Sequence, residues 1–244
     1  MIRHLTIAAL LIATPAAYAA APSPIAAAVA DPSRPAEDTA RDAERKPADM
    51  LAFAGVKPGM AVLDFMPGGG YFTRLFSDVV GPKGKVIAYI PDEFLAKSQR
   101  PLERATAAAQ GHANVQVEHN PLMAPGPDNV LDVVWTSQNY HDLHNLPGID
   151  LVAFNKLVFR SLKPGGIYIV LDHAAPAGSG LTNTNDLHRI DPAAVRKEAE
   201  AAGFVFVGES KVLANPADAR TAKVFDPSVR GHTDQFIYKF RRPK

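Results

Sequence analysis

The stretch from Ala61 to Thr73 constrains the fold of this chain more than any other part of the sequence. A short apolar run carrying Asp64 breaks at Met66 and Pro67, three glycines follow, and a run that permits a helix begins at Tyr71. Open α/β sheets build nucleotide sites from a strand, a glycine turn and a helix, because glycine lets the backbone approach a ligand and the helix N-terminus offers N–H groups. Any tight turn can use glycine, but further strand–helix units follow here. We therefore expect a small-molecule pocket at this turn.

The composition is that of a globular chain and excludes several kinds of site. Of the 244 residues, 47% are hydrophobic and 21% are charged, which suits one domain with a full core. The formal net charge of +1 gives no electrostatic reason to expect a nucleic-acid partner. The chain has no cysteine, which excludes disulfides, thiolate metal sites and a cysteine nucleophile.

The N-terminus has the pattern of a secretory signal peptide. Arg3 and His4 precede an apolar run over residues 5–13 that is too short to span a bilayer, and small residues surround Tyr18 at positions 17 and 19. We predict a signal peptide over residues 1–19 and an exported protein, periplasmic or secreted, with no membrane span after cleavage. An alanine-rich tail and a single membrane anchor are the alternatives.

The next segments read as a leader and an arm. Residues 20–35 are rich in alanine and proline without a helical period, which predicts a flexible leader. Residues 36–55 predict a charged helical arm, restarted at Pro47 and capped by Gly55. The charges of this region are either a solvated helix face, the commoner case for charge runs, or part of an arm over the pocket; they are Arg34, Arg41, Asp42 and Arg45.

The remainder of the chain alternates between strand and helix patterns. Besides 61–65, strands are predicted at 85–90, 115–117, 130–136, 167–171, 204–207 and 235–240, and helices at 94–110, 151–162 and 192–202. Parallel neighbours need helical crossovers, so this order predicts an α/β fold. We expect a doubly wound, mostly parallel seven-stranded sheet with helices on both faces and a C-terminal antiparallel strand pair, in a single domain over residues 36–244.

The order of motifs resembles that of class I S-adenosylmethionine-dependent methyltransferases, which have a Rossmann-like fold. The matching segments cover roughly residues 48–240; they are 56–59, Asp64 with its glycine turn, 85–90, 162–166 and 201–204. More narrowly, residues 45–47, 51–55, 67–71 and 140–143 are similar to an exported branch of predicted methyltransferases. The resemblance implies S-adenosylmethionine as cofactor and a small-molecule substrate.

The resemblance also implies which residues contact the methyl donor. The family's first motif maps onto the turn, and its ribose-binding acid falls at Ile90, so that Asp92 or Glu93 could substitute only if the end of the strand is reshaped. Met66 stands where the family carries a glycine. The implied cofactor-binding residues are Asp64, Pro67, Gly68, Gly69, Gly70 and Asp92.

Polar residues follow the fourth and fifth predicted strands, whose ends converge beside the glycine turn. Histidine and carboxylate groups there can act as general acids and bases, whereas the absence of a short His-x-x-x-His spacing gives no specific metal motif. Helix caps and surface positions are the alternative roles. The predicted catalytic residues are Tyr140, His141, Asp172, His173, His188 and Arg189; no metal ligands are assigned.

Two functions remain open from the sequence. The first is a methyltransferase that acts on an unknown small molecule in an exported compartment. The second is an exported protein of the same fold that has lost the donor, and is either a ligand-binding protein or an enzyme centred on the His and Asp groups, with or without a metal. Met66, Ile90 and the export signal motivate the second.

Overall fold

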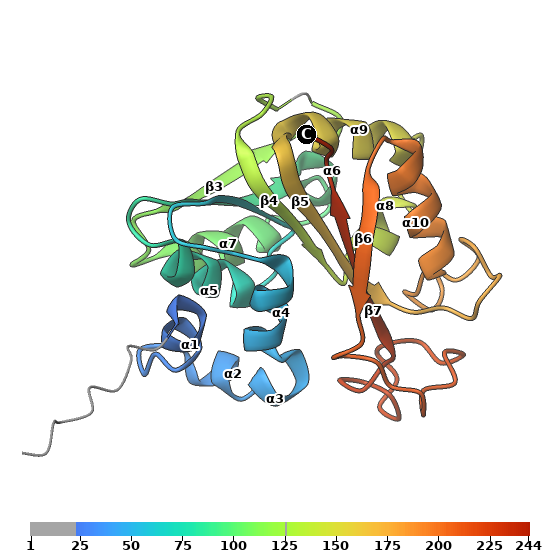
Figure 1. Cartoon of the computed structure of the whole chain (residues 1–244). Helices are drawn as coiled ribbons and strands as arrows, with labels where there is room; N and C mark the ends of the chain where they lie inside the picture. Colours follow the sequence, from blue (N-terminus) through green and yellow to red (C-terminus); the bar gives the residue numbers. More distant parts are fainter. Residues whose placement is uncertain (1–22, 125) are drawn as a thin grey trace, which may run out of the picture.

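The computed structural model describes residues 23–124 and 126–244, so the predicted signal peptide lies outside the described residues. Its centre is one seven-stranded sheet (Figure 1). The strands are β1 Ala61–Phe65, β2 Lys85–Pro91, β3 Val115–Asn120, β4 Leu131–Ser137, β5 Leu162–His173, β6 Val205–Ser210 and β7 Gln235–Arg241.

The strand order, β3-β2-β1-β4-β5-β7-β6, confirms the predicted doubly wound sheet. Strands β1 to β5 are parallel, and β7 runs antiparallel between β5 and β6, which confirms the C-terminal antiparallel pair. The chain winds outward from β1 through β2 to β3 and then returns to the other side of β1 at β4. The order therefore reverses between β1 and β4, and sheets of this kind bind ligands outside the carboxyl ends of the strands at that point.

Helices cover both faces of the sheet (Figure 1). One face packs Trp135 and Ile169 against α4 Pro47–Ala54 and α5 Tyr71–Val80, with α7 Arg100–Ala109 beside α5. The opposite face packs Val134 and Tyr168 against the second set, α8 Tyr140–Leu143, α9 Leu151–Ser161 and α10 Pro192–Ala201. Alternate residues of the central strands are thus buried on opposite sides, as a sheet covered on both faces requires.

Two helix boundaries follow from single residues. Gly55 ends α4 in the left-handed conformation, φ 77°, as the sequence predicts. The predicted helix over residues 94–110 is instead two helices, α6 Asp92–Leu95 and α7. Pro101 stands at the start of α7, where its missing N–H and fixed φ suit a first turn but cannot continue a preceding helix.

The expected flexible leader is replaced, over the residues described, by helix α1 Pro24–Val29. Ser23 caps this helix through a hydrogen bond from the Ala26 amide, and Ala28 is buried where α1 packs on α5. The alanines of this segment give no amphipathic pattern in the sequence, but their small side chains allow α1 to pack closely on α5. Within residues 23–124 and 126–244, no helix is both long and apolar enough to cross a bilayer.

Candidate active site

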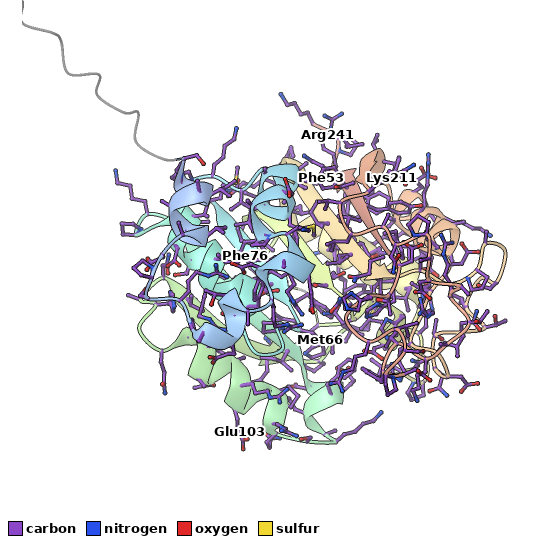
Figure 2. All side chains as sticks on the ribbon, turned by 90° about the horizontal axis from the view of Figure 1, so that it is seen from below. Phe53, Met66, Phe76, Glu103, Lys211 and Arg241 are labelled. Carbon is purple, nitrogen blue, oxygen red and sulfur yellow. The ribbon has the colours of Figure 1, made fainter. Side chains whose placement is uncertain are left out.

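A cavity of about 790 Å³ lies where the sheet order reverses. It is bounded by the turn after β1, by the arm and by the residues that follow β4; we call it the turn cavity. Figure 2 looks onto this edge of the molecule and shows Met66 near its middle. The lining side chains used below belong to Asp38, Arg41, Arg45, Asp64, Met66, Ser137, Asn139 and Asp142.

The glycines of the turn have two different roles. Gly70 precedes α5 with φ 76°, and a Cβ added there would lie 2.2 Å from the Cβ of Ala108, so this glycine allows α7 to pack closely. Gly68 and Gly69 line the turn cavity, and a Cβ at either would meet nothing within 4 Å. Pro67 lines the cavity beside them. The turn therefore presents the backbone of Gly68 and Gly69 to the cavity, whereas Gly70 is a packing residue.

Met66 occupies a backbone conformation that favours glycine. Its φ is 53°, in the left-handed region, and its amide donates to the Tyr89 carbonyl oxygen at 2.8 Å. The side chain lines both the turn cavity and a smaller cavity of about 270 Å³ beyond it. The turn keeps the shape expected of a glycine at this position while adding a thioether side chain to the cavity wall.

Asp64 is a buried carboxylate on the wall of the turn cavity. Its Oδ2 accepts a hydrogen bond of 2.6 Å from the Thr73 hydroxyl, which joins the end of β1 to the first turn of α5. Burial raises the pKa of Asp64 to about 7, although the Thr73 hydrogen bond and the positive charge of Arg45 oppose the shift. The charge of this wall therefore changes near neutral pH.

The arm is clamped over the cavity by ion pairs. Helices α2 Ala36–Thr39 and α3 Asp42–Arg45 lie at the lower edge of Figure 1, toward which β5 runs. The Asp38 carboxylate is 2.6 Å from Nη2 of Arg74 on α5. Asp42 accepts two hydrogen bonds of 2.8 Å from Arg34 and one of 2.6 Å from the Tyr71 hydroxyl. The sequence left open whether these charges form a solvated helix face or belong to an arm over the pocket. The structure shows the second, because the arm contributes Arg41 and Arg45 to the cavity wall.

Arg45 is the cation that this arm contributes to the cavity. Its guanidinium lies over the Tyr71 ring, 4.8 Å from the centroid, and its buried Nε has no hydrogen-bond partner among the described residues. Burial, aided by the nearby charge of Arg41, lowers the pKa of Arg45 to about 10, so the group remains charged at neutral pH. A partly buried cation without an ion-pair partner among the described residues is available to bind an anionic ligand group.

The far end of the cavity lacks the acid that the sequence analysis sought. Ile90 is buried and lines the smaller cavity together with Met66. Asp92 begins α6 after Pro91, and its Oδ1 lies 2.8 Å from Nδ1 of His119 on β3. The prediction that Asp92 replaces the ribose-binding acid is wrong, because the chain turns at Pro91 and directs that carboxylate to the surface.

Residues after β4 complete the cavity, and the sequence analysis did not select them. Asn139 donates from Nδ2 to the Phe65 carbonyl oxygen at 2.9 Å, which holds the ends of β1 and β4 together. Its Oδ1 and the Ser137 hydroxyl are buried without partners among the described residues. Their position at the end of a buried strand beside the switch point was the available signal. Both are acceptors that a ligand ammonium could bind.

The strongest polar contact outside the turn joins His141 to Asp172. The Asp172 side chain is fully buried and lies 2.8 Å from His141 Nδ1, and it accepts from the backbone amides of His141 at 2.9 Å and His173 at 2.7 Å. Burial alone lowers the pKa of His141, but the Asp172 charge outweighs it and leaves this pKa above its ordinary value. The structure thus brings together these predicted residues, and His188 joins them with Nδ1 3.3 Å from His141 Nε2.

His173 faces a second cavity of about 490 Å³. Its Nδ1 lies 2.7 Å from the Thr233 hydroxyl, and burial lowers the pKa of the ring to about 4, so it is uncharged at neutral pH. The two cavities adjoin, because five residues line both; these are Arg41, Arg45, Phe72, Ser137 and Gln138. We call the second one the His173 cavity.

Two predicted catalytic residues are structural instead. Tyr140 is buried among α9 and α10, where its hydroxyl donates to Glu198 at 2.8 Å and accepts from Asn155 at 2.8 Å. Arg189 is 0% exposed, and its Nη1 is 2.8 Å from the Asp218 carboxylate. It also donates to the carbonyl oxygens of Ala174 and Ala222. Its Nε and Nη1 are engaged by the protein, and its Nη2 is buried without a partner among the described residues. Because the whole side chain is buried, it is not offered to a ligand in either cavity.

The sheet, the glycine turn and the adjoining cavities define a class I S-adenosylmethionine-dependent methyltransferase fold. Among solved structures, one described as a S-adenosylmethionine-dependent methyltransferase from Aquifex aeolicus aligns with a TM-score of 0.59 and 22% identity, covering 86% of this chain and 93% of that one. An arsenic(III) S-adenosylmethionine methyltransferase from Chlamydomonas reinhardtii aligns with a TM-score of 0.56 and 19% identity, covering 92% and 75%. At these identities the likeness shows the fold.

The chain belongs to the ubiE/COQ5 methyltransferase family, which its sequence matches over residues 45–191. It is 30% identical over 194 residues to a ubiquinone/menaquinone biosynthesis C-methyltransferase UbiE of Ectopseudomonas mendocina, covering 78% of this chain and 65% of the relative. It is 38% identical over 124 residues to the protein of the same description from Pasteurella multocida, covering 50% and 43%. The chain thus spans about half to two thirds of the length of these relatives.

S-adenosylmethionine is the cofactor that this family implies, and the turn cavity fits its amino-acid end. Arg45 offers an unpartnered guanidinium to a carboxylate, and Asp64 and Asn139 offer acceptor oxygens to an ammonium group. The smaller cavity, walled by Met66 and Ile90, suits a flat aromatic base. The residues present therefore fit the cofactor, with a ribose end that lacks the family's carboxylate.

Proposed function

We propose that this protein is a S-adenosylmethionine-dependent methyltransferase that acts on a small molecule in an exported compartment. One observation carries the proposal most directly: the Arg45 guanidinium, whose Nε has no hydrogen-bond partner among the described residues, and the buried Asp64 carboxyl group line the same cavity beside the glycine turn. A cation and a carboxylate in one cavity complement the zwitterionic end of an amino acid. When bound, the cofactor supplies an electrophilic methyl group.

The protein's own contribution is positioning. The His173 cavity shares its wall with the turn cavity, so an acceptor held there lies next to the donor site. Holding two reactants in contact and away from water accounts for much of the rate in such transfers. His173 lines this cavity and is uncharged at neutral pH, so it is the imidazole that would take a proton from an acceptor there.

Calorimetric titration tests donor binding without knowledge of the acceptor. S-adenosylhomocysteine should bind the purified chain with a dissociation constant between about 1 µM and 1 mM, the usual range for enzyme ligands. Arg45→Ala should weaken it at least about tenfold, the cost of a charged hydrogen bond. The matched control is Arg160→Ala, which removes an exposed arginine that pairs with Asp128 and lines neither cavity. Absence of binding at millimolar ligand would refute the proposal.

The second candidate, a protein of this fold without the donor, is favoured by one observation. Ile90 is apolar and buried where the family carries a ribose-binding acid, so two ribose hydroxyls would lack an acceptor there. Under this alternative, S-adenosylhomocysteine would not bind, and a thermal-shift screen of metabolites with a free carboxylate would find the ligand.

The exported location rests on the signal-like sequence of residues 1–19. The apolar run over residues 5–13 and the small residues around Tyr18 support it. Expression of the full gene in a Gram-negative host, followed by N-terminal sequencing, tests it. A mature chain that begins at Ala20 and is recovered from the periplasm supports export, whereas an intact N-terminus in the cytosol contradicts it.

A further inference from the structure

Three side chains at the end of β4 converge on one point. His141 and Asp142 are consecutive in α8, and His188 comes from the loop that follows β5; we call them the His141 cluster. His141 Nε2 lies 3.3 Å from His188 Nδ1 and 3.4 Å from Asp142 Oδ1. His188 Nδ1 lies 3.5 Å from the same Asp142 oxygen. The three atoms thus form a nearly equilateral triangle.

The size of this triangle matches one face of a metal coordination shell. Tetrahedral ligands held at about 2.0–2.1 Å from a metal lie roughly 3.3–3.4 Å from one another. A histidine–carboxylate hydrogen bond that held the cluster by itself would be shorter, at about 2.7–2.9 Å. The His141 contact with Asp172, at 2.8 Å, shows that length in the same ring. The contacts of His141 Nε2 with His188 and Asp142, at 3.3 Å and 3.4 Å, are therefore longer than that hydrogen bond and match the spacing of metal ligands.

Asp172 fixes the tautomer of His141 that can bind a metal. Its ionised carboxylate accepts the Nδ1 hydrogen, so the lone pair of a neutral His141 ring is on Nε2, toward His188 and Asp142. Metal-binding histidines commonly donate their other ring nitrogen to a carboxylate, which fixes the ring and makes it a better ligand. The backbone amides of His141 and His173 hold this carboxylate in place.

We propose that His141 Nε2, His188 Nδ1 and Asp142 Oδ1 bind one divalent transition-metal ion. Two imidazoles and one carboxylate are a ligand set for zinc and for non-haem ferrous iron, and three protein ligands leave a position open for water or an oxygen-bearing ligand. Asp142 lines the turn cavity, and Phe225, whose ring centroid is 5.0 Å from that of His188, lines the His173 cavity. Through Asp142 the cluster therefore borders the turn cavity, and through the contact of His188 with Phe225 it lies beside the His173 cavity.

This site does not depend on methyl transfer. A His141 lone pair that binds a metal cannot also accept a proton, so the site excludes the role of general base for His141. Metal analysis therefore decides between a base and a ligand at this position, whereas binding of S-adenosylhomocysteine to the metal-free chain tests the donor site separately.

The test is a titration of the full chain, purified without an affinity tag, with Zn²⁺ in competition with a coloured chelator. We expect one equivalent of tightly bound Zn²⁺. Asp172→Asn should weaken binding about 10–100-fold, the usual cost of losing the group that orients a ligand. His188→Ala and Asp142→Ala should each weaken it further, because they remove ligands. Substitution with Co²⁺ should give the intense visible absorption of a four-coordinate ion.

The controls separate the site from loose surface binding. His119→Ala removes a histidine that is 52% exposed on β3, and should leave the stoichiometry and affinity unchanged. Thermal unfolding of each variant without metal shows whether it is folded, and His188 and Asp142 are both partly exposed, so either substitution can be accommodated. The proposal would be overturned if the wild-type chain did not bind Zn²⁺ or Fe²⁺ tightly. It would also be overturned if His188→Ala and Asp142→Ala bound the metal as tightly as the wild type.

Discussion

The turn cavity and the His141 cluster differ in how far their charged groups are satisfied by hydrogen bonds within the protein. In the turn cavity, Arg45 has a buried nitrogen without a partner, and Asp64 is held mainly by one hydroxyl. Beside the His141 cluster, Asp172 accepts three hydrogen bonds, and both of its oxygens are engaged. The first region leaves its polar capacity for a ligand, whereas the second uses its carboxylate to hold one imidazole in place.

This difference separates the side chains that stabilise the fold from those that are needed to bind a ligand. A buried group that is already satisfied is expensive to remove, because its partners are left without hydrogen bonds. A buried group that awaits a ligand is cheap to remove but necessary for binding. Substitutions in the two regions should therefore differ in their effects on stability and on ligand binding, and like responses would contradict the contrast.

The largest expected effect is on folding, from Asp172→Ala. The substitution leaves the His141 ring and two backbone amides buried without an acceptor, so the free energy of unfolding should fall by about 3–5 kcal/mol. Arg45→Ala should change it by no more than about 1 kcal/mol, because no described side chain loses an ion-pair partner. Urea unfolding measures both. Similar losses in the two variants would contradict the contrast.

Substitution of two glycines of the same turn, Gly70 and Gly69, should give a difference in stability almost as large. Gly70→Ala places a Cβ against Ala108 at a left-handed φ and should destabilise the protein by about 2–4 kcal/mol. Gly69→Ala meets open space, so its stability should be unchanged while S-adenosylhomocysteine binds more weakly. Thermal unfolding and calorimetry of both variants check this. A destabilised Gly69→Ala would show that the turn does not face a cavity.

The two regions should also respond to pH in opposite directions. Asp64 has a folded pKa of about 7, raised by burial from 3.8, so between those values only the unfolded state releases the proton and stability falls as pH rises. His173 has a folded pKa of about 4, lowered by burial from 6.5, so stability falls as pH falls through that range. Each slope is at most about 1.4 kcal/mol per pH unit.

Single variants should separate these slopes. Between pH 4 and 6.5, Asp64→Asn should lose more stability on acidification than the wild type, and His173→Gln should lose less. Urea unfolding across that range is the measurement. Parallel curves for wild type and both variants would show that neither group is buried as described.

The smallest expected effect is on the arm. Asp38→Asn removes the charge of a nearly buried ion pair with Arg74 but keeps an oxygen that can accept the hydrogen bond, so it should cost about 1 kcal/mol. Hydrogen exchange of the amides in residues 36–45 should quicken, and binding of S-adenosylhomocysteine should weaken because Arg45 is less well placed. Exchange rates that do not change would indicate that the other contacts of the arm, such as Arg34 with Asp42, suffice.

The sequence predicted the sheet well because its signals are local. Apolar runs, glycine turns and the Gly55 cap are each encoded within a few residues, and the order of these elements then fixes the topology. His141, Asp172 and His173 were predicted from strand ends, which the topology brings together. Donor contacts at Pro67, Gly68 and Gly69 are consistent with the cavity lining, and binding at these residues stays a prediction.

The errors arose where a distant partner decides the direction of a side chain. Arg189 pairs with Asp218, from a loop without a periodic pattern, so nothing near Arg189 in the sequence revealed the pair. Tyr140 and His141 are neighbours on one helical turn, where successive side chains point about 100° apart. Tyr140 therefore points to α9 and α10, whereas His141 points to Asp172. Arg45 looked like one charge of a solvated face, because its burial depends on how the arm packs on Tyr71.

A crystal structure of the chain with S-adenosylhomocysteine bound would test the central claim most directly. The account predicts the ligand's carboxylate on Arg45, its ammonium near Asp64 and Asn139, and its base in the small cavity between Met66 and Ile90. A ligand bound elsewhere, or an empty turn cavity at saturating ligand with Arg45 paired to a group of the protein, would contradict it.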